Sequence, residues 1–218
     1  MPTPVTSKNF ASRNRRHQSE FRKRQLIEAT LDCIDRLGIS QTTLAQIAER
    51  AGVSQGNVIF HFQNKETLLE QTLIYLRDEY TRTWQEALEK SAPDPVSRLR
   101  ALITSSFAPQ VCSRKKISVW FAYWGESRSR PGYRKVCGDS DQMFSDTLLG
   151  LCREMEREYG ASMRAETAAL VIESMSDGLW QNLLINAPSL RREEAIEAVF
   201  ELVATIYPET AESFALRM

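Results

Sequence analysis

A short aromatic stretch is the first part of this sequence whose residue types and spacing could do chemistry. The letters WFAYW occupy positions 120–124, so that Trp120 and Trp124 lie one helical turn apart. Aromatic ring faces attract cations, and they suit quaternary ammonium groups because such groups have no N–H to donate. Further along, Asp177 and Trp180 are three residues apart and would share one face of a helix. Together these residues predict the walls and the counter-charge of a site for a cationic ligand.

The candidate ligand site combines both stretches, with either of two acids as its counter-charge. Glu126 lies just beyond the aromatic stretch and is the alternative to Asp177. A second interpretation stays open, because tryptophans at helical spacing are also typical of an ordinary hydrophobic core. The predicted ligand-binding residues are Trp120, Tyr123, Trp124, Asp177 and Trp180.

A second group consists of polar residues whose side chains can form hydrogen bonds to DNA bases. Gln55 and Asn57 lie at the start of a short predicted helix, 55–62, whose other side is apolar. Gln and Asn amides pair with adenine in the major groove. Gly56 between them would let the helix approach a duplex closely. This helix is therefore the predicted recognition helix.

Four neighbouring residues complete the predicted DNA contact. His61 either faces outward with the polar group or packs over the following helix. Lys65 begins that helix, where its charge and the free N–H groups both suit a phosphate. Thr42 or Thr43 can cap the preceding helix and donate to the DNA backbone. The predicted DNA-binding residues are Thr42, Thr43, Gln55, Gly56, Asn57, His61 and Lys65.

The elements around this group have the pattern of a helix-turn-helix. Apolar residues at spacings of three and four predict a helix over 20–37 that ends at Gly38. A second helix is predicted over 43–51, and Gly52 supplies the backbone freedom of a tight turn. Ser54 is expected to cap the third helix.

The rest of the chain also predicts helices, because period-2 alternation and hairpin turns are scarce. We expect an all-α protein of about nine helices, with an N-terminal three-helix helix-turn-helix domain and a larger C-terminal helical bundle. The further predicted helices are 64–90, 95–107, 109–126, 133–158, 163–186 and 191–206. The predicted organisation is a disordered basic arm (1–18), the helix-turn-helix domain (19–66), a ligand-binding and dimerisation domain (67–207) and a flexible tail (208–218).

Composition limits the other classes of function. The 28 basic and 28 acidic residues balance, which argues against a purely architectural DNA-binding protein, although seven of the basic residues precede position 25. That basic arm either contacts DNA or only aids solubility. Four scattered cysteines and two histidines predict no metal site. No nucleophile elbow, phosphate loop or dinucleotide turn supports an enzyme, so we expect no catalytic residue and no cofactor. No apolar run is long enough to span a membrane.

The run TTLAQIAERAGVSQGNVIFHFQNKETLL, at positions 42–69, closely resembles the signature of the TetR family of bacterial repressors. Many members carry a phosphate-contacting aromatic, usually Tyr, where Ile59 stands, and Tyr or His where Phe60 stands. Ile59 cannot form that hydrogen bond, so the phosphate role is not transferred to it. WFAYW and DGLW, the latter at 177–180, resemble the choline-responsive BetI-type branch of this family.

The resemblance implies a cytoplasmic, nucleoid-associated repressor that binds double-stranded DNA at a palindromic operator. It further implies a homodimer paired through the last two long helices, and a small-molecule effector bound behind the DNA-binding domain. Choline or a related quaternary ammonium compound is the leading effector. A different cationic or amphipathic molecule is the alternative.

Overall fold

The computed structural model describes residues 7–126, 132–185 and 189–215, and every regular element in these ranges is helical. The all-α prediction is confirmed. The elements are α1 (Ser7–Gln41), α2 (Leu44–Ala51), α3 (Gln55–Phe62), α4 (Lys65–Lys90), α5 (Pro95–Ser106), α6 (Arg114–Glu126), α7 (Gly132–Tyr159), α8 (Ala165–Ile185), α9 (Arg192–Ile206), the 3-10 helix η1 (Pro208–Thr210) and α10 (Ala211–Phe214).

The chain forms two compact units, Met1–Tyr75 and Leu76–Met218. The predicted boundary fell at 66/67, whereas the structure divides inside α4. The first turns of α4 belong to the first unit because Leu68 is fully buried in its core. The Tyr75 hydroxyl also donates to the Glu28 carboxylate of α1 at 3.1 Å.

Local signals in the sequence explain how the first unit folds. Thr43 and Gln46 form a capping box at the start of α2. Gly52 ends α2 in the left-handed conformation, with φ of 66°, which a residue with a Cβ rarely adopts. The Ser54 hydroxyl accepts a hydrogen bond from the Asn57 N–H at 3.3 Å and so caps α3. These contacts set α3 against α2 and α1.

The N-terminal arm differs from its prediction over the residues that the structure describes. The helix α1 begins at Ser7 rather than near position 20. The prolines at positions 2 and 4 precede it, and no glycine or proline occurs between Ser7 and Leu37 to interrupt it. At Gly38, where the sequence predicts the helix to stop, φ is 77° and the helical backbone is broken.

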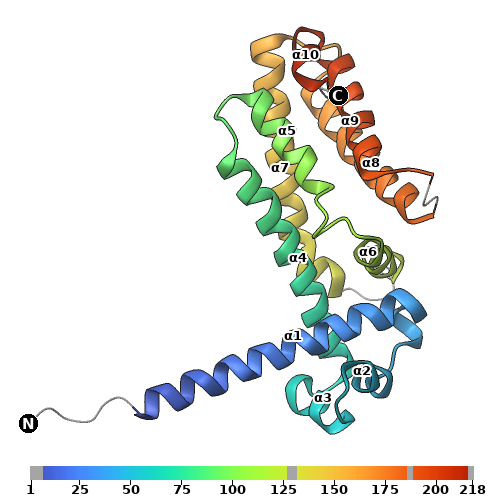
Figure 1. Cartoon of the computed structure of the whole chain (residues 1–218). Helices are drawn as coiled ribbons and strands as arrows, with labels where there is room; N and C mark the ends of the chain where they lie inside the picture. The colour runs from blue at the N-terminus through green and yellow to red at the C-terminus, as the bar shows by residue number, and fades with distance from the viewer. Residues whose placement is uncertain (1–6, 127–131, 186–188, 216–218) are drawn as a thin grey trace, which may run out of the picture. The chain divides into compact units, whose positions relative to one another are not determined.

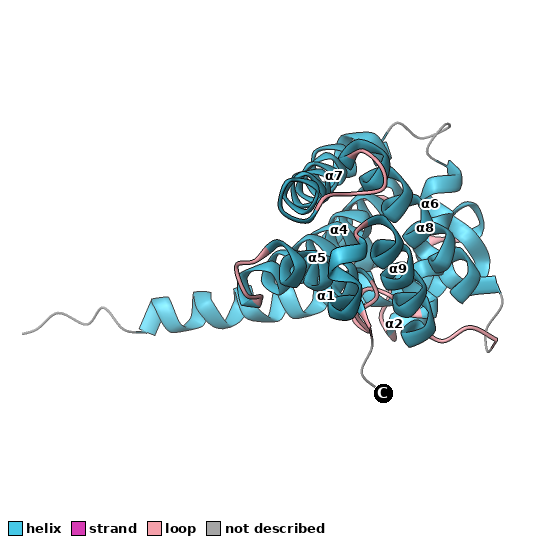
Figure 2. Ribbon diagram, turned by 90° about the horizontal axis from the view of Figure 1, so that it is seen from above, coloured by secondary structure: helices cyan, strands magenta, loops and turns pink. Residues whose placement is uncertain are grey.

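The second unit is a bundle in which α4, α5, α7, α8 and α9 run in similar directions while α6 crosses them (Figure 1). Figure 2 looks nearly along the axes of the lengthwise helices. α7 packs against α5 and α8, and α8 packs against α9. The helix α6 begins at Arg114 instead of the predicted 109, because the Ser113 hydroxyl accepts the Lys116 N–H and caps it there.

The predicted flexible tail is ordered and packed as far as the structure describes it. Phe214 of α10 is 2% exposed and meets the Phe200 ring edge-on, with 5.5 Å between centroids. The Arg100 guanidinium lies 4.5 Å from the Phe200 centroid and 5.6 Å from that of Phe214. The tail therefore closes one end of the bundle.

The predicted connections between the helices 109–126 and 133–158, and between 163–186 and 191–206, fall mostly outside the described residues. Among the residues that are described, no helix is long and apolar enough to cross a membrane. The same ranges contain no group of three or more His, Cys, Asp or Glu side chains that could hold a metal ion. All four cysteines are buried.

Candidate functional site

The recognition helix α3 presents a polar surface on one side and is anchored on the other. Val58 and Phe62 are buried in the core of the first unit. Gln55 and Gly56 are exposed. The sequence of α3 contains no acidic residue, so this surface can approach a polyanion without charge repulsion.

Gly56 is not required by the fold. A Cβ at this position would meet only the Ser54 hydroxyl, at an ordinary contact distance of 3.8 Å. Its backbone is helical, so alanine would be accepted or even preferred there. The absence of a side chain therefore leaves room outside the protein, as close approach to DNA requires.

The Asn57 side chain is less available for a hydrogen bond to a base than that of Gln55. The residue is half-buried, and its Oδ1 atom is enclosed without a hydrogen-bond partner. A bidentate contact with adenine needs both Oδ1 and Nδ2. Asn57 would have to rotate to read adenine, whereas Gln55 already lies in the open.

The structure corrects the role expected of Thr42 and narrows that of Thr43. Thr42 is fully buried, and its hydroxyl donates to the Gly38 carbonyl at 2.7 Å, which removes it from any DNA contact. The Thr43 hydroxyl caps α2, accepting from the Gln46 N–H at 3.3 Å and donating to Gln46 Oε1 at 2.9 Å. Thr43 therefore serves as the N-cap of α2, and its hydroxyl hydrogen is already used in the hydrogen bond to Gln46.

His61 and Lys65 remain at the surface of the first unit. His61 is half-buried, and burial together with Lys23 and Arg22 lowers its pKa, so the ring is neutral at pH 7. The Lys65 ammonium donates to the Ser40 carbonyl at 3.2 Å. This bond uses one of its three N–H groups and leaves the others for a phosphate.

The second unit contains a cavity of about 240 Å³ between α4, α5, α6, α7 and α8. Its lining joins aromatic rings to carboxylates, and none of the described lining residues is Lys or Arg. The lining residues are Tyr80, Ser106, Trp120, Trp124, Tyr133, Asp141, Phe144, Glu173, Ser176, Asp177 and Trp180. We call this space the aromatic cavity.

Two tryptophans of α6 form one wall of the aromatic cavity. The Trp120 and Trp124 rings have centroids 6.2 Å apart and planes inclined by 34°. The Trp124 indole N–H donates to the Tyr133 hydroxyl at 2.7 Å, and that hydroxyl donates to Asp141 Oδ2 at 3.3 Å. These two hydrogen bonds orient the Trp124 and Tyr133 rings and connect them to the Asp141 carboxylate, which lines the same cavity.

A second wall is built around Trp180 of α8. Its indole N–H donates to the Ser106 carbonyl at 3.1 Å, which satisfies its buried polar atom. Tyr80 meets the Trp180 ring edge-on, with 6.0 Å between centroids, and its hydroxyl lies 3.1 Å from Ser106 Oγ. These bonds leave the aromatic surfaces free to contact a ligand.

Three carboxylates share the aromatic cavity. Burial, and then the charges of Glu173 and Asp141, raises the pKa of Asp177 to about 6. The pKa of Asp141 is also raised, first by burial, with the Tyr133 hydrogen bond opposing the shift. Both residues nevertheless remain exposed to solvent. Glu173 accepts from the Ser145 hydroxyl at 2.9 and 3.1 Å.

A largely buried ion pair lies beside the aromatic cavity. The Lys116 ammonium donates to the Glu79 carboxylate of α4 and to the Gln110 carbonyl. Both partners of the ion pair are largely removed from solvent. Tyr80 follows Glu79 directly, and Trp120 lies one turn beyond Lys116, so the pair ties α4 to α6 beside the cavity.

The structure brings together four of the five predicted ligand-site residues. Trp120, Trp124, Asp177 and Trp180 line the aromatic cavity, whereas Tyr123 is buried outside its lining. Glu126, the alternative counter-charge, is not part of the lining either.

Sequence reasoning missed the residues that come from distant helices. Tyr80, Ser106, Tyr133, Asp141 and Phe144 carry no local signal that distinguishes them from other helical residues. Ser176, which directly precedes Asp177 on α8, carries no such signal either. Glu173 could have been found, because it lies one turn before Asp177 on the same helix.

Two protein-family models match this chain, one in each unit. The model of the bacterial regulatory proteins of the tetR family matches residues 26–72. The model of the BetI-type transcriptional repressor C-terminal domain matches residues 95–208.

Two relatives are similar to this chain over most of its length. The HTH-type transcriptional regulator BetI of Paraburkholderia phymatum is 32% identical over 194 residues, which is 88% of this chain and 96% of that protein. The BetI regulator of Yersinia pestis (strain Pestoides F) is 33% identical over 178 residues, covering 81% of this chain and 87% of that protein.

Solved structures share the fold. A transcriptional regulator from Pseudomonas aeruginosa PAO1 has a TM-score of 0.75 at 26% identity, covering 90% of this chain and 95% of that chain. A transcriptional regulator from Saccharomonospora viridis, solved in complex with choline, has a TM-score of 0.73 at 21% identity, covering 83% and 94%.

These features define a transcriptional regulator of the helix-turn-helix class. The chain belongs to the TetR family, and its second unit is of the BetI type. Both relatives are named as transcriptional regulators, which excludes the enzyme alternative.

Gly56→Ala is expected to weaken DNA binding without harming the fold. The added methyl has space within the protein, so thermal unfolding should occur at the same temperature or slightly higher. At a close protein–DNA contact the same methyl should lower affinity about tenfold, the scale of a lost specific contact. Fluorescence anisotropy on a selected operator duplex measures this. Unchanged DNA affinity would place Gly56 outside the interface.

Proposed function

We propose that the protein is a ligand-controlled repressor whose effector is a quaternary ammonium compound, with choline as the leading candidate. The aromatic cavity carries this proposal, because it combines aromatic walls with three carboxylates and none of its described lining residues is basic. The structural neighbour from Saccharomonospora viridis, which was solved with choline, supports the same class of ligand.

The cavity suits a small cation in both size and charge. Its volume of about 240 Å³ lies just below the ~300–1,000 Å³ of pockets for drug-sized molecules. Each ring face that meets a desolvated cation contributes roughly 0.5–2 kcal/mol. A quaternary ammonium group would also offset the repulsion among Asp141, Glu173 and Asp177. A different cationic molecule of similar size remains the second candidate, since the same charges would favour it.

The first unit is proposed to bind a palindromic operator through α3. Exposed Gln55, Gly56 without a side chain and the free donors of Lys65 support base and phosphate contacts. Two such helices in a symmetric dimer would enter major grooves about one helical turn apart. An effector that binds better to a conformation with the wrong spacing would lower operator affinity.

Dimerisation through α8 and α9 is proposed from the surface of α8. Leu170 and Ile185 are 65% and 66% exposed, although both are large and apolar. They occupy the two ends of one helix, which suits a long helix-to-helix seam. Sedimentation equilibrium should find a dimer at micromolar concentration, and Leu170→Asp should shift it toward monomer. A wild-type monomer would contradict the proposal.

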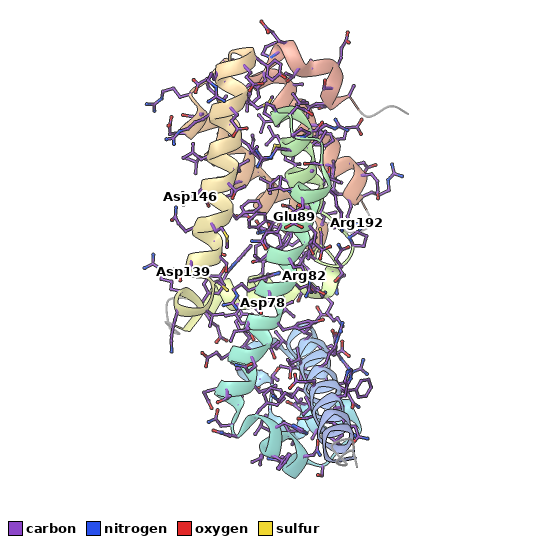
Figure 3. The ribbon with its side chains drawn as sticks, turned by 90° about the vertical axis from the view of Figure 1, so that its left-hand side faces the viewer. Asp78, Arg82, Glu89, Asp139, Asp146 and Arg192 are labelled. Atoms are coloured by element: carbon purple, nitrogen blue, oxygen red, sulfur yellow. The ribbon has the colours of Figure 1, made fainter. Side chains whose placement is uncertain are left out.

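Calorimetric titration of the full chain tests the ligand. Choline should bind about tenfold or more tightly than 3,3-dimethylbutan-1-ol, which has the same shape without the charge. Asp177→Asn should weaken choline binding while leaving the neutral alcohol unaffected. Asp139→Asn is the matched control, because Asp139 is exposed on α7 and does not line the cavity (Figure 3). Equal affinity for choline and the alcohol would overturn the cation site, and the absence of choline binding would exclude choline.

The same titration has an expected pH dependence. A cation favours the charged form of Asp177, whose pKa in the free protein is about 6. As the pH falls through this value, protonation competes with the ligand, so the affinity for choline should drop by about tenfold between pH 7.5 and pH 5. Asp177→Asn should flatten this dependence. A wild-type affinity that stays constant over the interval would show that the carboxylate does not contact the cation.

A further inference from the structure

The recognition helix carries a highly exposed aromatic side chain that takes no part in the hydrophobic core of the first unit. Phe60 is 81% exposed. A helix turns by about 100° per residue, so Phe60, two residues from both Val58 and Phe62, points away from the core that they anchor. It therefore occupies the centre of the face that would approach DNA.

The neighbours of Phe60 leave its ring accessible. Gly56, one turn earlier on the same side, has no side chain to cover it. His61 meets the Phe60 ring edge-on, with 5.1 Å between centroids and planes at 83°, so it supports one edge of the ring. Ile59 beside it is 44% exposed and extends the apolar surface.

An exposed ring at this position matches one chemical feature of the major groove. The only apolar group on a base edge there is the C5-methyl of thymine, which phenylalanine can contact. Phe60 has no hydrogen-bonding atom with which to read any other base. The ring also carries no charge for a phosphate, so its natural contact is a methyl group.

We propose that Phe60 is a specificity-determining residue that reads the C5-methyl of a thymine in each half-site of the operator. The inference rests on the proposed entry of α3 into the major groove. Phe60 would select thymine through an apolar contact, whereas Gln55 would form hydrogen bonds to a base. A protein partner seated on the same ring is the competing explanation, and the experiment below separates the two.

The test starts from selection of duplexes out of a random library with the full-length protein. In the selected duplex each thymine is then replaced singly by deoxyuridine, which removes only the methyl group. Wild-type protein should lose about fourfold in affinity at the thymine that Phe60 contacts, the factor expected for one methyl-sized apolar contact. Phe60→Ala should bind the thymine and deoxyuridine duplexes equally at that position.

Phe21→Ala is the matched control. Phe21 is 72% exposed in the same unit, on α1, so the substitution removes an equally exposed ring. It should keep the wild-type loss at the deoxyuridine position, and circular dichroism should show both variants folded.

Three outcomes would overturn the inference, and they are distinguishable. Insensitivity of the wild type to every deoxyuridine would show that no thymine methyl is read. A Phe60→Ala protein with wild-type affinity and wild-type sensitivity to deoxyuridine would place Phe60 outside the DNA interface and favour a protein partner. Failure to enrich any sequence would contradict the proposed operator binding itself, and the thymine contact with it.

Discussion

Mutual repulsion among three carboxylates in one aromatic cavity is the constraint on which the chemistry of the second unit depends. Asp141 comes from α7, and Glu173 and Asp177 come from successive turns of α8, where like charges destabilise a helix. Burial adds to this cost and raises the pKa of Asp177 to about 6. A cation would relieve the repulsion, and the tryptophan walls are suited to receive one.

The rest of the second unit holds that cavity in shape. The Lys116–Glu79 ion pair ties α6 to α4, and Trp180 is bonded to α5 through Ser106. Because α4 carries Tyr80 and begins at Lys65 beside the recognition helix in the sequence, one continuous helix belongs to both units. We propose that a ligand-induced movement of α4 would be carried along this helix into the first unit.

Local signals allowed much of the structure to be predicted from the sequence. Gly52, Ser54 and Thr43 act through contacts within a few residues of themselves, so the turn between α2 and α3 could be located to the residue. Trp120 and Trp124 were predictable for the same reason. Asp141 could not be identified, because only the packing of α7 against α8 brings it to the cavity. Tyr123 does not line the cavity, because it lies about 100° around the α6 helix from Trp124. Thr42 failed because its burial depends on the fold around Gly38.

We propose that a ligand in the aromatic cavity controls the affinity of the first unit for DNA. The most direct test of this proposal is a fluorescence anisotropy titration of a labelled operator duplex, at fixed salt, with and without saturating choline. Choline should weaken DNA binding by at least about fivefold, the lower end of typical allosteric coupling, and Asp177→Asn should abolish the effect. Equal DNA affinity in the presence and absence of bound choline would contradict the proposal.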